Sequence, residues 1–479
     1  MPAYAARKRG NVRGMALIAL WALTLGAARA EDGAVSSPQM AAPSSLEPAA
    51  QAASPTLPLQ ELNARWVYQL LLAEIAAQRN HFALATKTYL DLARTTRDPR
   101  VARRATEVAL YGHDLAAAQT ALELWLKEEP KSPSARETLG GLLMAQPHLE
   151  GTLPMINTLL NADKDSLGDD MLALDVILSQ HPDAAEAWRV GQQIAEPYPD
   201  VPEAHYLLAT LALRAGNQGK AEEEVQEALK LRPDWGMAVA MDAQLLQKTD
   251  PTQALNRYRR YLDAHPQERE MRLQYARLLV EQKDYAEGKR QFEALLQAQP
   301  GQPDLLLAVG LLDMQLGDYA SAETQFHTVL DHGYRDGDRV RFYLGQAAEE
   351  QHQWDNAIRW YSEVSGEGEQ RPLAQIRVAL IEAQQGKVQQ ALDRLSRLPV
   401  DSPLRLEQRT LAQEQIQRDS GDDQGAWDTL TATLATLPDS ADLLYERAMV
   451  EDKLGQLNDL EKDLRRVYCV FCQPARARE

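Results

Sequence analysis

Cysteine is almost absent from this chain, and its scarcity limits how the protein can be stabilised. Only two cysteines occur in 479 residues, Cys469 and Cys472, and both lie near the C-terminus. A disulfide framework across the rest of the chain is therefore excluded, so stability has to come from packing. Long apolar runs are also scarce. The longest, residues 15–27, is shorter than the roughly 20 residues that a membrane-spanning helix needs.

Recognisable catalytic motifs are lacking as well. The sequence contains no nucleophile elbow, no His-Glu-x-x-His, no phosphate-cradling glycine-rich loop and no dinucleotide fingerprint. Its nine histidines show no metal-ligand spacing. The carboxylates stand among Lys and Arg, often at i, i+4 spacing, which is typical of solvated helix surfaces. We therefore predict a protein that is not an enzyme and that uses no cofactor, metal ion or small-molecule substrate.

Basic residues are too few to balance the acidic ones. The formal net charge is −18, and it becomes −23 without residues 1–30, which hold five basic and no acidic side chains. A charge of this sign and size opposes binding to nucleic acid and to anionic lipid. The predicted partners are therefore proteins or peptides.

The N-terminus has the pattern of a secretory signal. Four basic residues, from Arg7 to Arg13, precede the apolar run, and Ala28-Arg29-Ala30 offers a cleavage site. We predict a signal peptide over residues 1–30 and export to the periplasm, with an uncleaved membrane anchor as the alternative. No cysteine lies near the cleavage site for lipid attachment. Residues 31–60 are rich in Ala, Pro, Ser and Gln, which predicts a disordered tether.

A mostly small residue returns about every 34 positions along most of the chain. We call these the ladder residues: Ala85, Ala118, Thr152, Ala187, Ala221, Ala254, Gly288, Ala322, Ala357, Ala391, Ala426 and Leu460. Further landmarks recur twelve residues before many ladder residues and four residues after them. On helices these landmarks form two buried stripes separated by a turn, so each unit is predicted to be a helical hairpin.

This pattern resembles the tetratricopeptide repeat (TPR) family, in which small residues let the two helices of a hairpin approach and an aromatic fills the gap beside them. The resemblance implies an all-α fold, a right-handed superhelical solenoid of about twelve hairpins over residues 61–467. An irregular tail is expected over residues 468–479. The third and fourth units fit worst, because they contain Pro147, Pro154, Pro182 and Thr152. We expect those two units to be distorted.

The resemblance also implies a concave groove lined by the first helix of each hairpin, with side chains from the second, fifth, ninth and twelfth positions of each unit. Transferred by position, it singles out as candidate protein-binding residues Tyr206, Leu273, Arg277, Leu307, Leu311, Met314, Phe342, Gln346, Arg100 and Arg103.

Two groups among these candidates have a structural alternative. Residues 304–316 are apolar nearly all round, so Leu307, Leu311 and Met314 form either the floor of the groove or a stripe that the superhelix itself covers. Arg100 and Arg103 could hold the carboxylate of a peptide. Alternatively, such arginines pair with Asp98 and Glu107 at a solvated helix end.

The stretches that begin at Tyr68 and Tyr89 resemble a proteobacterial envelope group of this family. Its better known members are outer-membrane lipoproteins that bring a carboxyl-terminal processing protease to peptidoglycan hydrolases, which implies a scaffold or adaptor role in the cell envelope. One alternative is an assembly factor for an envelope polysaccharide or secretion complex. Others are a redox or metal protein that uses Cys469 and Cys472, or a truncated form of a longer repeat protein.

Overall fold

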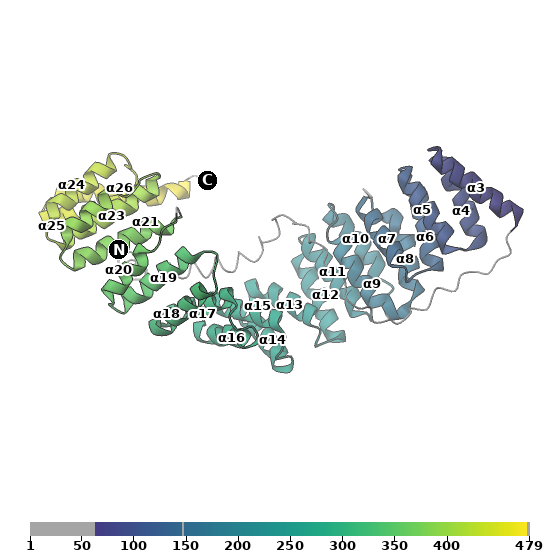
Figure 1. Ribbon diagram of the computed structural model, residues 1–479, viewed down its shortest axis with the longest axis horizontal. Coiled ribbons are helices and arrows are strands. Elements are labelled where there is room, and N and C mark those ends of the chain that lie inside the picture. The colour runs from purple at the N-terminus through teal and green to yellow at the C-terminus, as the bar shows by residue number, and fades with distance from the viewer. Residues whose placement is uncertain (1–62, 146–147, 367, 477–479) are drawn as a thin grey trace. The chain divides into compact units, whose positions relative to one another are not determined.

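The computed structural model describes residues 63–145, 148–366 and 368–476, and within these ranges the only regular structure is helical. Figure 1 labels the helices in chain order, from α3 to α26. The signal peptide and the tether predicted over residues 1–60 lie outside the described residues. In the described part, no helix is both long enough and apolar enough to cross a membrane.

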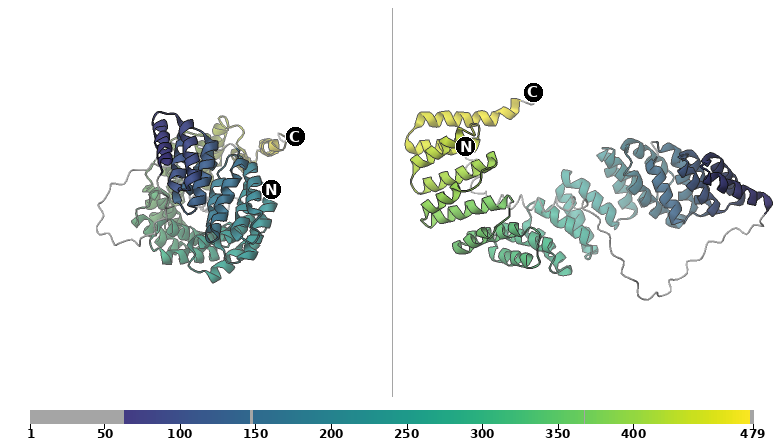
Figure 2. Two further views of the ribbon diagram at one scale, coloured as in Figure 1. Left: turned by 90° about the vertical axis from the view of Figure 1, so that its right-hand side faces the viewer. Right: turned by 45° about the horizontal axis from the view of Figure 1, so that its top comes forward.

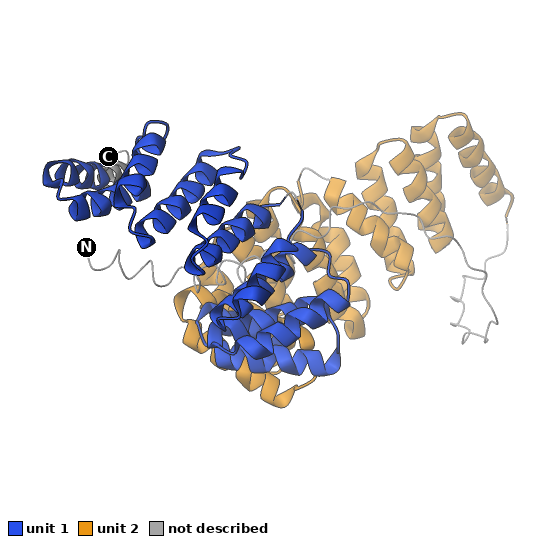
Figure 3. Ribbon diagram, turned by 60° about the vertical axis from the view of Figure 1, so that its left-hand side comes forward, with its two compact units in different colours: residues 1–33, 272–479 blue, residues 34–271 orange. Residues whose placement is uncertain are grey.

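The chain divides into two compact units, which Figure 3 shows in different colours. We call residues 63–271 the N-terminal unit and residues 272–476 the C-terminal unit; the boundary falls within α15 (Arg269–Glu281). The other helices of the N-terminal unit are α3 (Ala64–Gln78), α4 (Phe82–Thr96), α5 (Pro99–Tyr111), α6 (Leu115–Glu128), α7 (Pro133–Ala145), α8 (Leu153–Ala162), α9 (Leu167–Leu178), α10 (Ala184–Ala195), α11 (Pro202–Arg214), α12 (Gln218–Leu231), α13 (Gly236–Thr249) and α14 (Pro251–Ala264). Those of the C-terminal unit are α16 (Tyr285–Ala298), α17 (Pro303–Leu316), α18 (Tyr319–Asp331), α19 (Gly337–Glu350), α20 (Trp354–Ser362), α21 (Gln370–Gln384), α22 (Val388–Ser396), α23 (Pro403–Asp419), α24 (Asp423–Leu434), α25 (Ala441–Leu454) and α26 (Leu457–Arg476).

Consecutive helices pair as hairpins. In the C-terminal unit, α17 packs on α18, α19 on α20, and so on to α25 on α26, and the green to yellow helices of Figure 2 show this succession. The 24 α-helices of the described residues correspond in number to twelve hairpins. Every ladder residue is buried except Leu460, which is half-buried. The prediction of an all-α TPR solenoid of about twelve hairpins is confirmed, while the handedness of its superhelix stays a prediction.

In several hairpins the turn is made by a residue with positive φ followed by a residue whose side chain caps the second helix. Gly317 has a φ of 81°, a backbone conformation in which a side chain is strained. Asp318 follows it, and its carboxylate accepts a hydrogen bond of 3.2 Å from the backbone N–H of Ser321. This bond satisfies one of the free N–H groups at the start of α18. The same arrangement of Gly216 and Asn217 begins α12.

The third and fourth units depart from the regular hairpin, as the prolines predict. In the described residues, α8 packs closely on α6, and α9 on α11, but the tight pairing of other hairpins is missing between α7 and α8 and between α9 and α10. Two 3-10 turns, Glu150–Thr152 and Lys164–Ser166, lie in this region. Thr152 is fully buried, and its hydroxyl donates to the backbone oxygen of Leu149 at 2.6 Å. That bond satisfies the polar group at a ladder position where the other units place an apolar residue.

The C-terminal end corrects one prediction. α26 continues through residues 468–476, which the sequence analysis expects to be irregular. The loss of the repeat pattern after Val467 does not end the helix, because no glycine occurs there and the first proline is Pro474. The repeat pattern shows which residues pack against neighbouring helices. A helix can continue beyond that pattern wherever the residues tolerate helical backbone angles.

Several carboxylates are buried, contrary to the interpretation that they belong to solvated surfaces. Asp242, Asp313 and Glu414 are each at most 2% exposed. Each lies beside a cation: Asp313 is 2.5 Å from Nζ of Lys289, and Asp242 and Glu414 are each 2.7 Å from an arginine. The i, i+4 pattern does not distinguish an exposed carboxylate from one paired inside the helix stack.

Candidate protein-binding site

The apolar stripe on α17 is covered by the protein itself. Leu307 and Leu311 are 1% exposed and Met314 is 7% exposed, and all ten residues from Leu305 to Met314 are buried. The three side chains belong to the hydrophobic core of the C-terminal unit, as does Phe342. Gln346 on α19 is also buried. A partner could not reach these five candidates. The alternative interpretation, in which the protein itself covers the apolar stripe, therefore applies.

Tyr206, Leu273 and Arg277 remain partly accessible. Tyr206 on α11 is half-buried, and its ring lies 5.0 Å from the ring of Trp235. Leu273 packs against the core of the C-terminal unit, and Arg277 lies one turn further along α15. No ion pair joins Arg277 to another described residue, so its charge is available.

The two arginines predicted for the groove are paired locally. Arg100 donates to Asp98 through two nitrogens, at 3.0 Å and 2.6 Å. Arg103 donates to Glu107 at 3.0 Å. These are the partners named by the solvated-helix alternative. Both arginines are more than half exposed. The exposed Arg103 pair contributes little to stability. Asp98 is only 13% exposed and also caps α5, so a ligand carboxylate would replace it on the guanidinium of Arg100 while Asp98 keeps its bond to the helix N-terminus.

Arg100 also borders an apolar cavity at the start of the N-terminal unit, between helices α3, α4 and α5. The cavity measures about 380 Å³ and we call it the N-terminal cleft. Its lining residues are Trp66, Val67 and Leu70 from α3, Tyr89, Leu92 and Thr96 from α4, and Asp98, Arg100, Val101 and Arg104 from or just before α5. Most of these side chains are apolar or aromatic, and the charges lie along α5. Such a composition is typical of sites that take an apolar side chain and hold a nearby polar group.

A hydrogen-bonded network fixes one wall of the N-terminal cleft. The hydroxyl of Tyr89 donates to Glu74, and Nε of Arg104 donates to the same carboxylate at 3.2 Å. These bonds hold the pKa of Glu74 below its usual value, with the bond from Tyr89 as the largest cause. Burial raises the pKa of Tyr89. Glu74 is therefore ionised at neutral pH and Tyr89 is not. The network that joins Glu74, Tyr89 and Arg104 keeps the same charges and hydrogen bonds around neutral pH.

The outer side of α3 exposes apolar side chains next to the cleft. Leu70 is 44% exposed and Leu71 is 56% exposed, while Tyr68 and Ile75 are more than 45% exposed. The sequence analysis used this stretch only for its resemblance and did not select these residues. The signal that could have found them is the run of leucines from Leu70 to Leu72 beside Tyr68 and Ile75.

The structure bears on the metal alternative but not on the redox alternative. They contain no cluster of three or more His, Cys, Asp or Glu side chains able to hold a metal ion. Cys469 is a free, exposed thiol on α26. The side chain of Cys472 lies outside the described residues, so pairing of the two cysteines stays untested.

Comparison with known proteins identifies one kind of repeat in the middle of the chain. Models of the tetratricopeptide repeat match residues 178–235, 245–312 and 307–372. A TPR repeat-containing protein from Pseudomonas aeruginosa is 34% identical over 400 residues, which covers 83% of this chain and 67% of that protein. A TPR protein structure from Parabacteroides merdae aligns with a TM-score of 0.37 and 16% identity, covering 52% of this chain and 98% of its own. The structure of YrrB, described as a TPR protein with an unusual peptide-binding site, aligns with a TM-score of 0.31 and 16% identity, over 41% of this chain and 97% of its own.

Proposed function

This chain belongs to the tetratricopeptide repeat family, and we propose that it is a non-enzymatic scaffold that binds a protein partner in its N-terminal cleft. The observation that carries the proposal is the combination of an apolar cavity, exposed leucines beside it and an arginine on its border. An apolar side chain of the partner enters the cavity, and a carboxylate of the partner takes the place of Asp98 on Arg100. Burial of the leucines supplies the affinity, and the charged pair sets the orientation.

The location and the partners belong to the same proposal. The signal pattern of residues 1–30 supports export to the periplasm. The resemblance of the first two hairpins to envelope adaptors supports recruitment of a protease to cell-wall hydrolases. An adaptor of this kind accelerates a reaction by raising the effective concentration of one bound partner near another, without chemistry of its own.

The test is a pull-down from a bacterial envelope extract with the full chain, followed by binding measurements on each purified protein that is retained. Leu70→Glu places a charge in the N-terminal cleft. Leu213→Glu is the matched control, because Leu213 is 40% exposed and lies outside the cleft. We expect one partner to bind the unchanged chain and the control but to be lost from Leu70→Glu. Equal binding to all three chains would rule out the cleft as the site.

The adaptor role needs a second readout. A protease and a cell-wall hydrolase should bind the chain at the same time, which analytical ultracentrifugation of the three purified proteins would detect as one ternary complex. Formation of only binary complexes, or competition between the two partners, would contradict the adaptor proposal and leave simple partner binding in place.

A further inference from the structure

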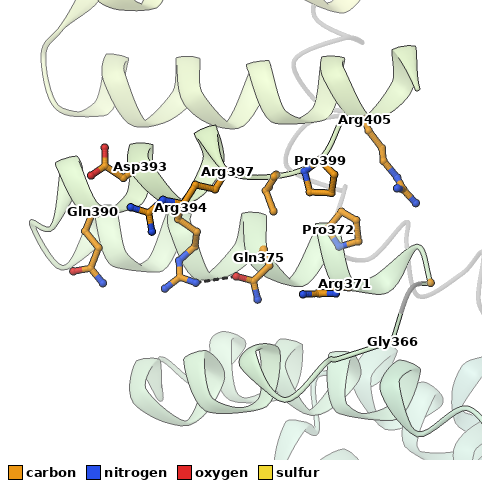
Figure 4. Close-up of a pocket in the computed structure, with 12 residues that line it drawn as sticks. Gly366, Arg371, Pro372, Gln375, Gln390, Asp393, Arg394, Arg397, Pro399 and Arg405 are labelled. Carbon is orange, nitrogen blue, oxygen red and sulfur yellow. Dashed lines mark hydrogen bonds between the residues drawn. The ribbon is translucent and has the colours of Figure 1, made fainter. Parts of the chain in front are cut away.

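A second, larger cavity lies in the C-terminal unit between α21, α22 and α23. These three helices pack on one another, and the cavity between them measures about 770 Å³ (Figure 4). Its lining residues are Gly366, Gly368, Arg371, Pro372, Gln375, Gln390, Asp393, Arg394, Arg397, Leu398, Pro399 and Arg405. We call it the arginine cavity. None of these residues occupies a groove position of its repeat, so the cavity is separate from the groove that the family resemblance implies.

Positive charge dominates the arginine cavity, although the whole chain carries a net charge of −18. Among the described lining residues, four are arginines and one, Asp393, carries a carboxylate. Two of the four are engaged by the protein. Arg394 donates to Glu382 at 2.7 Å and 2.9 Å and to Gln375 at 2.8 Å, the bond drawn in Figure 4. Arg405 pairs with Asp401.

The other two arginines carry charges that no described acidic side chain neutralises. Arg371, at the start of α21, and Arg397, just after α22, are both exposed. Neither forms an ion pair within the part of the chain that the structure describes. Arg394 differs from Arg371 and Arg397 because its hydrogen bonds join α22 to α21. Arg371 and Arg397 are therefore the cations that an incoming anion would meet.

The walls favour an extended peptide over a small ion. Pro372, Leu398 and Pro399 provide apolar contact. The amides of Gln375 and Gln390 each make one hydrogen bond inside the protein and keep further N–H groups for a ligand. A guanidinium binds a carboxylate through two parallel hydrogen bonds, so two arginines from different helices can hold two acidic side chains of one segment. A cavity of 770 Å³ is much larger than one carboxylate requires.

We propose that the arginine cavity binds an acidic peptide segment of a protein partner, with Arg371 and Arg397 contacting its carboxylates. This inference rests on the proposed scaffold function, and it assigns the scaffold a second site with its own chemistry. Two sites in separate units allow one chain to hold two different partners, one through apolar side chains and the other through charge.

The experiment measures fluorescence anisotropy of a labelled heptapeptide that alternates Ala and Glu, titrated with the full chain. The same peptide with Gln in place of Glu is the ligand control. The test variant combines Arg371→Ala and Arg397→Ala. The protein control combines Arg335→Ala and Lys387→Ala, which removes two exposed charges of the same unit outside the cavity. Circular dichroism should show the same helicity and melting for all chains, because neither test arginine is buried or ion-paired.

We expect the Glu peptide to bind the unchanged chain and the protein control alike, and to bind the test variant at least about tenfold more weakly. The Gln peptide should bind none of them measurably. No binding of the Glu peptide, or equal weakening by both double variants, would overturn the proposal. Competition by inorganic phosphate or polygalacturonate at the peptide's own concentration would also overturn it, because the site would then recognise anions in general.

The two proposals can fail separately. Leu70→Glu, which tests the N-terminal cleft, should leave the affinity for the Glu peptide unchanged. Loss of peptide binding only in the arginine double variant would support the arginine cavity even if no partner is found for the cleft.

Discussion

Gly345 on α19 lies directly against the ring of Tyr361 on α20. A Cβ atom at residue 345 would stand 2.5 Å from Cε1 of that ring, closer than real side chains approach. The ring cannot easily move, because Tyr361 is fully buried and its hydroxyl donates to Glu349 at 2.8 Å. Glu349 in turn accepts from Arg377 on α21, in the next hairpin. A single glycine therefore sets the approach of two helices and, through Tyr361, the contact with a third.

Replacing Gly345 with alanine should destabilise the protein by about 2 kcal/mol, because the added methyl group overpacks a site whose aromatic partner is fixed. Gly141→Ala is the control: nothing lies within 4 Å of a Cβ at that exposed helical position. There alanine should be neutral or stabilise by up to about 1 kcal/mol, since it has the higher helix propensity. Urea unfolding followed by circular dichroism measures both. Equal stability of the two variants would show that Tyr361 relaxes without cost.

The sequence predicts contacts of this kind well, because they depend only on spacing along the helix. Gly345 and Gly310 each lie twelve residues before a ladder residue, and each faces a buried aromatic ring of its own hairpin. Spacing does not reveal exceptions. Asp175 and Asp242 occupy the same position in other units, where their carboxylates are buried, that of Asp175 on a helix that packs on α11. The repeat therefore predicts where two helices meet. Whether the residue at that position is a glycine or a buried carboxylate depends on the side chains of the neighbouring helices.

Asp175 should make the stability of the protein depend on pH. Burial raises the pKa of Asp175 to about 6, with Thr210 acting in the opposite direction, and its Oδ1 has no hydrogen-bond partner among the described residues. The folded chain holds the proton more tightly than the unfolded chain, whose pKa is about 3.9. The stability associated with this group is therefore fully present below about pH 4 and is lost as the pH rises through about 6.

Asp175→Asn should remove this dependence. At pH 7 the variant should be more stable than the unchanged chain by about 1–3 kcal/mol, and at pH 3.5 the two should be equally stable. Urea unfolding at a series of pH values gives the difference. A constant difference across the series would mean that Asp175 titrates normally in the folded protein.

Lys289 and Asp313 should show strong coupling in a double-mutant cycle. Asp313 is fully buried, and burial raises its pKa although the bond from Lys289 acts to lower it. Lys289→Met alone leaves this carboxylate without its cation and should destabilise the protein by about 3 kcal/mol at pH 7. Combining it with Asp313→Leu should recover most of that loss, because no buried charge remains. Additive effects of the two substitutions in urea unfolding would show that the pair is not coupled.

The candidate site was harder to predict than the fold. Positions transferred from the family assume that the first helix of each hairpin keeps one face open. That assumption holds for Tyr206 and Arg277 in part, but the neighbouring hairpins close over Leu307 and Leu311. The arginine cavity depends on how three helices pack, since Arg371 on α21 and Arg405 on α23 both line it. The spacing of residues within a single repeat does not show how neighbouring helices pack to form such a cavity.

The burial of Leu307 leads to a prediction that separates the open groove from the closed one. Leu307→Glu forces a carboxylate into the core of the C-terminal unit and should cost about 4 kcal/mol or more, which would unfold at least the hairpins around α17. Leu71→Glu makes the same chemical change on the exposed side of α3 and should alter stability by no more than about 0.5 kcal/mol. Thermal melting by circular dichroism, with limited proteolysis to locate any unfolded segment, compares them. If Leu307→Glu melts like the unchanged chain, residue 307 faces solvent and the stripe on α17 is available to a partner after all.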